Sequence, residues 1–491
     1  MGIPKPDEVF DRAWEWDSLM AFARGTRVPR LGIVSGRRRQ GKSFLLRRIC
    51  AHPDVRGLYV QAQEQTRQVA LQQFVDAISR QLGTAASIRF PGWDEALRFV
   101  MSGAPPLLVI DEFPYLLQHS PELTSVIQAL YDDARNDPAA PGLRLIICGS
   151  TLSVMTELLS GQKPLRGRAL LDLNLAPFDF RESARFWGIR DLEVAFRLHA
   201  VFGGTPGYRD LVDEAPPERA DELDAWLGDH VFQPSRAMLR EVDYLLREDP
   251  RMTDRALYQS VLTAIAGGAR TPSKVGGVLG RSDRALAHPL SVLESGGFVR
   301  RMGDVLKQRG SRLALTDPIV RFHEVVLLPR LAEFEERRGR RALAMAEPSV
   351  SSLVMGPHFE HLCRVWTARF GPDEGLGRPV GPVGATTLAD PRGRTSHDVD
   401  VVALEEGEMA GRRDARVAVI GEAKATNRPR DLGDLDRLEH VRRLLEDQGT
   451  RAAGATLALF SRSGFDRRLR AAASGRADVL LVDLAHLYGV R

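Results

Sequence analysis

A glycine-rich segment followed by a lysine and a serine is the strongest chemical signal in the sequence. Residues 36–43 read Gly-Arg-Arg-Arg-Gln-Gly-Lys-Ser and fit the spacing G-x-x-x-x-G-K-[ST] at every fixed position. The glycines let backbone N–H groups turn onto phosphate oxygens, and the helix that follows adds the positive end of its dipole. An apolar run at residues 31–35 precedes the segment, so the context is strand, loop and helix. The sequence therefore predicts a phosphate-binding loop (P-loop).

The residues of this loop have predicted roles in binding ATP and Mg²⁺. Lys42 would reach the β- and γ-phosphates, and the Ser43 hydroxyl would bind Mg²⁺. Contacts to the nucleotide are expected from Gly36, Arg37, Arg38, Arg39, Gln40, Gly41, Lys42, Ser43 and Phe44.

Two further apolar runs end in polar residues that could complete this site. Residues 107–111 end in Asp111 and are followed by Glu112, while residues 143–148 are followed by Gly149 and Ser150. Ligands of parallel sheets bind at the carboxyl ends of the strands, which places these residues beside the P-loop. Asp111 would hold Mg²⁺ through water, and Glu112 would polarise the attacking water. Ser150 would either sense the γ-phosphate or cap a helix.

A second set of charged residues lies in the C-terminal third. Glu422 and Lys424 end a predicted strand and share one face, because side chains alternate along a strand. Asp400 lies on an earlier predicted strand and can reach that face if the strands pair; Asp398 would share its face and is the alternative, disfavoured by its less apolar flanks. With Glu360 on a predicted helix, these carboxylates would bind Mg²⁺ at a phosphodiester, and Lys424 would offset charge.

The elements that must position these residues begin with a parallel α/β sheet. Short β-branched runs alternate with helical patterns over the first ~160 residues. Residues 151–250 are predicted to be mostly helical. The predicted strands of the sheet cover residues 31–35, 57–61, 107–111 and 143–148.

Residues 254–317 predict three helices and a β-hairpin, which together form a winged helix-turn-helix. Its third helix carries Arg281 and Arg284 but few other side chains that could read bases, so packing against the N-terminal region is favoured over DNA contact. The predicted helices cover residues 256–266, 275–279 and 283–293, and the predicted strands cover 298–301 and 305–307.

Beyond a charged stretch at residues 333–341, the chain predicts a second α/β unit. Residues 371–384 are predicted to be a loop rich in glycine, proline and arginine. Helices are expected at residues 350–370 and 432–445, and strands at 397–404, 415–424, 455–460 and 479–482.

Composition places few restrictions on partners. The net charge of +4 permits a nucleic-acid partner without requiring one. No apolar run approaches the ~18 residues of a membrane helix, and residues 1–12 lack the order of a signal peptide. Cys50, Cys148 and Cys363 are far apart in sequence, which argues against a disulfide framework or a zinc cluster. The expected location is the cytoplasm, without a membrane partner.

The order of the N-terminal motifs resembles the archaeal-type ATPases of the STAND branch of AAA+ proteins. Residues 10–12 match that family's segment near the adenine, and residues 203–208 match its GG-x-P-x-Y lid motif, whose proline, here Pro206, contacts the base. The resemblance implies arginine fingers at Arg166 or Arg168, with a solvated loop as the alternative. It also implies a slow nucleotide switch that could act within a homo-oligomer or with a regulatory protein.

The C-terminal third resembles the PD-(D/E)XK nuclease-related domain that is fused to these ATPases. Val399 replaces the proline of that name, which removes no ligand, and residues 459–466 and 481–488 are similar to the family's ends. The expected fold is a P-loop sheet with a helical lid, a winged helix and an endonuclease-like α/β domain. The expected boundaries are 1–175 for the ATPase core, 176–250 for the lid, 251–320 for the winged helix, 321–349 for a linker helix and 350–491 for the nuclease-like domain.

The leading hypothesis is an ATP-switched protein that processes DNA, with ATP hydrolysis at Lys42, Asp111 and Glu112 and Mg²⁺-dependent cleavage at Asp400, Glu422 and Lys424. The alternative is a regulatory switch that binds DNA or protein without cutting, with residues 350–491 as a docking module. A metabolic P-loop kinase fits poorly because it leaves the C-terminal half unexplained.

Overall fold

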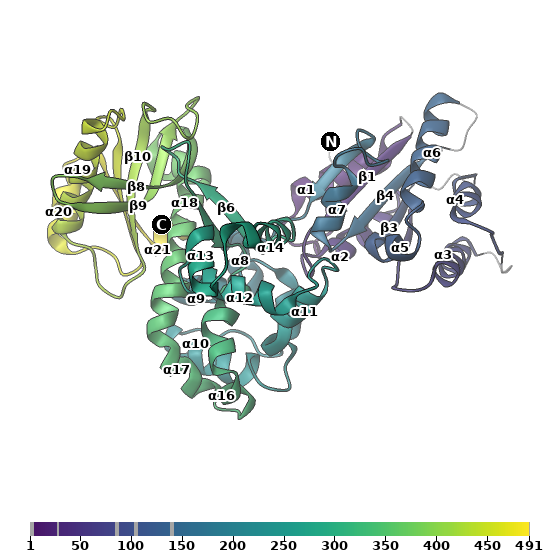
Figure 1. The fold of residues 1–491 in the computed structure, drawn as a ribbon, viewed down its shortest axis with the longest axis horizontal. Helices are drawn as coiled ribbons and strands as arrows, with labels where there is room; N and C mark the ends of the chain where they lie inside the picture. Colours follow the sequence, from purple (N-terminus) through teal and green to yellow (C-terminus); the bar gives the residue numbers. More distant parts are fainter. Residues whose placement is uncertain (1–3, 27–28, 84–87, 103–106, 138–141, 491) are drawn as a thin grey trace.

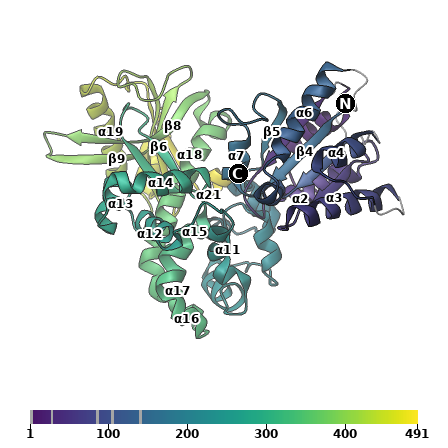
Figure 2. The same ribbon diagram turned by 45° about the vertical axis from the view of Figure 1, so that its right-hand side comes forward.

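The computed structural model describes residues 4–26, 29–83, 88–102, 107–137 and 142–490. Two five-stranded sheets lie at opposite ends of the molecule, and a set of helices lies between them (Figure 1). Turning the molecule by 45° keeps the same three-part arrangement (Figure 2). Within the described residues, no helix is both long enough and apolar enough to cross a membrane.

The N-terminal sheet is parallel throughout and has the strand order β2-β3-β4-β1-β5. All four strands expected from the sequence are present, and one edge strand, β5, was not predicted. Half of its residues are exposed, so it lacks the continuous apolar run of the others. The strands are β1 (Arg30–Ser35), β2 (Leu58–Gln61), β3 (Leu108–Asp111), β4 (Arg144–Gly149) and β5 (Ala169–Asn174).

Helices cover both faces of this sheet and form two separate cores. One core joins α1 (Ala13–Arg24) and α2 (Lys42–Ala51) to one face, where Val34, Val109 and Ile146 are buried. The helices of the other face are α3 (Arg67–Leu82), α4 (Trp93–Ser102), α5 (Phe113–His119), α6 (Leu123–Asn136) and α7 (Leu152–Leu158). This doubly covered parallel sheet leaves the carboxyl ends of its strands free to build a site.

The first helices of the middle region follow the N-terminal sheet. They are α8 (Phe180–Trp187), α9 (Leu192–Phe202), the short helix η1 (Pro206–Leu211), α10 (Leu223–Trp226) and α11 (Glu241–Arg247). The three helices predicted next are present as α12 (Arg255–Ala266), α13 (Pro272–Leu279) and α14 (Asp283–Ser295), and Thr271 and Ser282 cap α13 and α14.

The hairpin that follows differs from its prediction. Its strands are β6 (Val299–Gly303) and β7 (Ser311–Leu315), so the second strand begins six residues later than the expected segment 305–307. That segment forms the connection instead, and Val305 donates a backbone hydrogen bond to Ala385 of the C-terminal sheet and packs into its core. The prediction of a strand at residues 305–307 is therefore wrong. The apolar residues of this segment are buried by the C-terminal sheet and not by pairing within the hairpin.

Four α-helices, with short 3-10 and π-helical segments beside them, lead from the hairpin to the second sheet. They are α15 (Pro318–Phe322), α16 (Leu331–Glu335), α17 (Gly339–Ser349) and α18 (Gly356–Arg369). The charged stretch predicted at residues 333–341 spans the break between α16 and α17.

The C-terminal sheet is mixed and has the strand order β12-β11-β10-β9-β8. β8, β9 and β10 are antiparallel, whereas β10, β11 and β12 are parallel. β8 (Val380–Asp390) begins inside the stretch 371–384 that was predicted to be a loop; its glycines concealed it. The remaining elements are β9 (Thr395–Glu405), β10 (Val417–Lys424), α19 (Leu432–Asp447), β11 (Thr456–Ser461), α20 (Arg467–Ser474), β12 (Val479–Asp483) and α21 (Leu484–Tyr488).

α18 covers one face of this sheet and α19 the other. Trp366 packs against Phe460 on the α18 side, and Leu438 lies in the core on the α19 side. Val399 and Val402 both belong to the α19 core although they are three residues apart, because the pairing of β9 with β8 shifts register there. The resulting bulge falls at residues 400–401 and interrupts the simple alternation assumed for Asp400.

Candidate functional site

The P-loop connects β1 to α2 at the carboxyl edge of the N-terminal sheet, as the sequence predicted. Gly41 has a φ of 88°, a left-handed conformation that favours glycine. A Cβ on Gly36 would lie 2.7 Å from the carbonyl oxygen of Leu175, so a larger residue does not fit there. Both glycines are therefore required by the backbone path of the loop.

Lys42 is buried beneath this loop. Its Nζ donates hydrogen bonds to the carbonyl oxygens of Gly36 at 2.7 Å and Arg37 at 2.9 Å. The ammonium group is therefore held at the centre of the loop, where a phosphate chain would lie. Ser43 follows in the first turn of α2 and is half-buried.

Two acidic residues face the P-loop from the end of β3. Asp111 is fully buried, and its two oxygens accept hydrogen bonds from the Tyr59 hydroxyl at 2.5 Å and from the Glu112 backbone at 2.9 Å. Glu112 accepts a hydrogen bond from the Ser150 hydroxyl at 3.1 Å. Burial and the neighbouring Asp111 raise the pKa of Glu112, while Lys42 partly lowers it. Asp111, Glu112 and Ser150 therefore lie together beside the P-loop.

A pocket of about 490 Å³ extends from the P-loop toward the N-terminal segment. Phe10 packs edge-on against Phe178 and Phe186, with ring centroids 5.4 and 5.3 Å apart, and Arg12 lies over the Phe178 ring. Pro206 lines the same pocket. This wall of aromatic rings suits a flat base, and Phe10, Arg12 and Pro206 of the predicted contacts line the pocket.

Sequence reasoning missed three residues of this site. Tyr59, Phe178 and Phe186 carry no motif and cannot be told from core aromatic residues by type alone.

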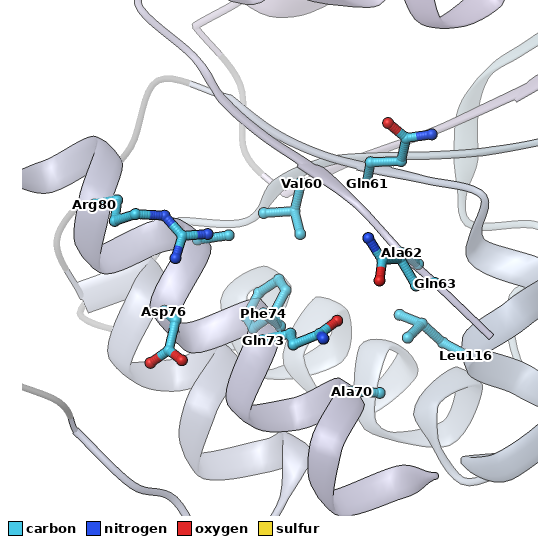
Figure 3. A pocket seen from close by; sticks show the side chains of 11 residues that line it. Val60, Gln61, Ala62, Gln63, Ala70, Gln73, Phe74, Asp76, Arg80 and Leu116 are labelled. Carbon is cyan, nitrogen blue, oxygen red and sulfur yellow. The ribbon is translucent and has the colours of Figure 1, made fainter. Parts of the chain in front are cut away.

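Another pocket, of about 270 Å³, lies between the end of β2 and α3 (Figure 3). Val60 and Gln61 from the strand and Asp76 and Arg80 from the helix are among the residues that line it. None of the predicted site residues lines it. The pocket beside the P-loop therefore remains the candidate nucleotide site.

The variable residues of the P-loop contact the middle helices. Arg39 makes a two-pronged ion pair with the fully buried Glu241 of α11, with distances of 2.7 and 3.0 Å. Gln40 donates a hydrogen bond to Thr205 at 3.0 Å. The loop is therefore attached to the region that follows the sheet.

The other two P-loop arginines extend this attachment. Arg37 pairs with Asp317 at 2.8 Å and lies over the ring of Phe298, at the start of the hairpin. Arg38 pairs with Glu248 just after α11. All four variable positions of the loop thus contact residues more than 160 positions later in the chain.

Neither predicted finger arginine lines the nucleotide pocket. Arg168 makes a two-pronged ion pair with Asp132, and Arg166 donates to the carbonyl oxygen of Gly161. Both are tied to their own neighbourhood, so a role within the same chain would require that segment to move.

The predicted C-terminal residues gather near the bulge in β9. Asp400 is mostly buried and accepts a hydrogen bond from the Ala423 backbone at 3.0 Å. Glu422 pairs with Lys424 at 2.5 Å and with Arg437 at 2.8 Å. Burial raises the pKa of both carboxylates, and Glu360 and Asp400 contribute as neighbouring charges. Asp398, the alternative ligand, instead pairs with Arg312.

Two observations argue against this cluster as a preformed metal site. Within the described residues, the ligand atoms of Glu360, Asp400 and Glu422 do not all lie within 4.8 Å of one another. Arg364, on α18, lies 3.9 Å from Glu360 and donates to the carbonyl oxygen of Asp400 at 2.7 Å. The carboxylates share a neighbourhood, but they are held apart and are partly neutralised by cations.

A cationic pocket of about 610 Å³ opens beside these carboxylates. Its charged lining comes from the hairpin, its connection and α18. Arg300 has a buried Nε without a hydrogen-bond partner, and burial together with the nearby Arg364 lowers the pKa of Arg300. Five positively charged residues line the pocket: Arg300, Lys307, Arg309, Arg312 and Arg364.

Comparison with known protein families identifies the N-terminal region. Residues 9–192 match the model of an ATPase domain found predominantly in Archaea. This region therefore resembles an archaeal-type ATPase domain.

Relatives and solved structures of similar proteins match larger parts of the chain. An uncharacterized protein of Methanocaldococcus jannaschii is 26% identical over 250 residues, which are 50% of this chain and 53% of the relative. This chain thus spans about half the length of that relative. A Walker-type ATPase of Pyrococcus abyssi covers 66% of this chain and 98% of its own, at 19% identity and a TM-score of 0.47. The ORC2 protein of Aeropyrum pernix, with ADPNP and ADP, covers 70% and 97%, at 13% identity and a TM-score of 0.44.

Proposed function

We propose that the ATPase domain is a nucleotide-controlled switch that acts on a Mg²⁺-dependent DNA-processing domain at residues 350–491. The attachment of the P-loop carries this proposal, because every variable residue of the loop contacts the region after the sheet. We assign residues 1–175 to the ATPase core, 176–250 to a lid, 251–320 to a winged helix and 321–349 to a linker helix.

The roles proposed at the nucleotide site follow from its geometry. Lys42 exchanges its two loop carbonyls for phosphate oxygens when ATP binds. Ser43 and Asp111 supply the oxygen ligands that suit Mg²⁺, which neutralises charge on the phosphates when bound. Glu112 orients the attacking water, and Ser150 holds the Glu112 carboxylate in place.

This site would couple to the rest of the chain through the same loop. A phosphate chain that reorders the backbone of the P-loop also strains the ion pairs of Arg37 and Arg39 with Asp317 and Glu241. The two carboxylates belong to different parts of the middle region, so a change at the loop reaches both. The P-loop would then make different contacts in the nucleotide-bound and nucleotide-free states, which a switch requires.

The proposed nuclease site consists of Glu360, Asp400, Glu422 and Lys424. Oxygen ligands from three carboxylates suit Mg²⁺, and the raised pKa values of Asp400 and Glu422 reflect repulsion and burial that a cation would relieve. Lys424 would release Glu422 to stabilise the phosphoryl charge in the transition state.

The cationic pocket supports a phosphodiester backbone as the ligand next to this site. Arg364 links the two directly, because it lines the pocket and also donates to the backbone of Asp400. A buried guanidinium such as Arg300, with an unpartnered Nε, gains most from an anion. Nucleic-acid phosphates are therefore the proposed charge partners of this pocket.

The alternative, a switch that binds DNA or protein without cutting, is favoured by one observation. Glu422 is already paired with two cations, and the three carboxylates are held apart. On this reading, the C-terminal domain binds a partner and the ATPase controls its access.

The test uses the full-length chain, supercoiled DNA, Mg²⁺ and ATP. Cleavage should be lost in Asp400→Ala and kept in Asp436→Ala, an exposed acid on α19 that serves as the control. Calorimetry with Mg²⁺ should show weaker binding in Asp400→Ala. An unchanged Mg²⁺ affinity together with intact DNA binding would instead establish the non-cleaving alternative.

A further inference from the structure

Two histidines and an aspartate converge at the far end of the C-terminal sheet. Asp390 ends β8, His397 lies near the start of β9, and His440 lies in α19. One ligand atom of each side chain lies within 4.8 Å of the other two. This group is separate from the predicted nuclease residues, none of which belongs to it.

Both imidazole rings present Nε2 to the same oxygen atom, Oδ2 of Asp390. His440 donates to it at 3.0 Å, whereas Nε2 of His397 lies 3.6 Å away, beyond hydrogen-bond distance. Nε2 of His397 is buried and has no hydrogen-bond partner. A buried polar atom without a partner destabilises a fold, so hydrogen bonding alone does not account for this arrangement.

The geometry fits a metal ion. Ligand atoms about 2.1 Å from a common ion lie roughly 3.0 to 3.4 Å from each other in octahedral or tetrahedral coordination. The distances of 3.0 and 3.6 Å to Asp390 Oδ2 fall close to this range. A small movement of His397 toward Asp390 would bring both distances within this range.

The surroundings prepare Asp390 as a ligand. Its other oxygen accepts a hydrogen bond from the Gly393 backbone at 2.9 Å, which fixes the carboxylate and directs Oδ2 toward the histidines. A Cβ on Gly393 would lie 2.7 Å from Oδ2, so glycine keeps this oxygen accessible. The Asp390 side chain is 7% exposed and that of His440 is 41% exposed, so the group is anchored inside and open to solvent on one side.

We infer that Asp390, His397 and His440 bind a divalent transition-metal ion. Imidazole nitrogens select ions such as Zn²⁺, Co²⁺ or Fe²⁺ over Mg²⁺, and two histidines with one carboxylate leave coordination positions for water. The ion links the turn between β8 and β9 to α19. Arg437, one turn earlier in α19, pairs with Glu422, so the metal also fixes the helix that contacts the proposed nuclease site.

The experiment titrates full-length protein with Co²⁺ in the absence of nucleotide and follows its visible absorption. The wild-type chain should bind one Co²⁺ with ligand-field bands, and Zn²⁺ should displace it. His397→Ala, His440→Ala and the isosteric Asp390→Asn should each weaken binding by more than about 10-fold, because each removes or weakens a direct ligand. His119→Ala, an exposed histidine of α5, is the matched control and should bind as wild type.

A substitution in the proposed nuclease site distinguishes that site from this transition-metal site. Asp400→Ala should keep the Co²⁺ bands with unchanged affinity. The inference is overturned if the wild-type chain binds no Co²⁺, if all three ligand variants bind as tightly as wild type, or if Asp400→Ala alone abolishes the bands. Asp390→Asn preserves side-chain shape, so it keeps the test decisive even where an alanine variant fails to fold.

Discussion

Replacing Arg39 by alanine should loosen α11 from the P-loop far more than replacing its neighbour Arg38. Both arginines belong to the same loop and both pair with a glutamate at or near α11. The side chain of Glu241 is 0% exposed and that of Arg39 is 21% exposed, whereas the Arg38–Glu248 pair is 49% and 22% exposed. The two variants therefore compare a buried and an exposed ion pair in one loop.

The magnitude follows from which charge is left behind. Removing one partner of a buried pair costs about 3–5 kcal/mol because the other charge remains buried and unpaired. Since Arg39 is partly exposed, we expect the lower end, about 3 kcal/mol, which is roughly a 100-fold change in a local opening equilibrium. An exposed pair contributes about 0–1 kcal/mol, so Arg38→Ala should change the equilibrium about 5-fold at most.

Hydrogen–deuterium exchange of the α11 amides measures this opening directly, on the full chain without nucleotide. Adding Glu241→Gln to Arg39→Ala should slow the exchange again, because it removes the unpaired buried charge. Equal acceleration in Arg39→Ala and Arg38→Ala, or no recovery in the double variant, would refute the reasoning.

Three further predictions concern nucleotide, assembly and pH. Lys42→Ala should weaken ATP binding in calorimetry by about 10-fold or more, since charge-assisted contacts to phosphate contribute about 1.5–3 kcal/mol, while Glu112→Gln should bind ATP normally and hydrolyse it more slowly; unchanged affinity in Lys42→Ala would show that the site is misassigned. ATP turnover should rise with protein concentration and fall in Arg166→Ala if that arginine acts in trans, and a specific activity that stays constant with concentration would contradict this. Burial lowers the pKa of His199 from 6.5 to about 4. Between these values the unfolded chain binds more protons than the folded one, so stability should fall as pH drops below about 6.5, by up to about 1.4 kcal/mol per pH unit. His199→Phe should show a smaller loss in thermal midpoint between pH 7 and pH 5, and an identical loss would count against the burial argument.

The N-terminal sheet could be predicted from the sequence because its central strands are buried on both faces. Such strands are continuous apolar runs, and the P-loop residues follow one of them directly. β5 and β8 could not be found this way. β5 lies at an edge and is half exposed, and β8 contains Gly381 and Gly384 within a strand that the C-terminal sheet stabilises through its pairing with β9.

The candidate sites divide along the same line. Residues fixed by a local motif, such as Lys42 and Asp111, were predicted, because spacing along the chain already places them. Phe178 reaches the pocket only through the tertiary fold. The same holds for His397 and His440, which are 43 positions apart in sequence and meet at Asp390 only after β9 and α19 pack together. The bulge at residues 400–401 also could not be predicted, because the argument from sequence assumed that side chains alternate regularly along the strand.

The core of the middle helices continues into the α18 face of the C-terminal sheet, whereas the α19 face has a separate core. Phe180 of α8 packs against Tyr488 of the last helix, and Arg181 pairs with Glu374 and donates to the carbonyl oxygen of Leu487. The two cores of the N-terminal sheet are separate from it. Residues from about 180 onward should therefore melt as one cooperative block, distinct from the transition of the N-terminal sheet. A fragment that begins near residue 345 would expose the partner surface of α18 and α21 to water and would tend to aggregate.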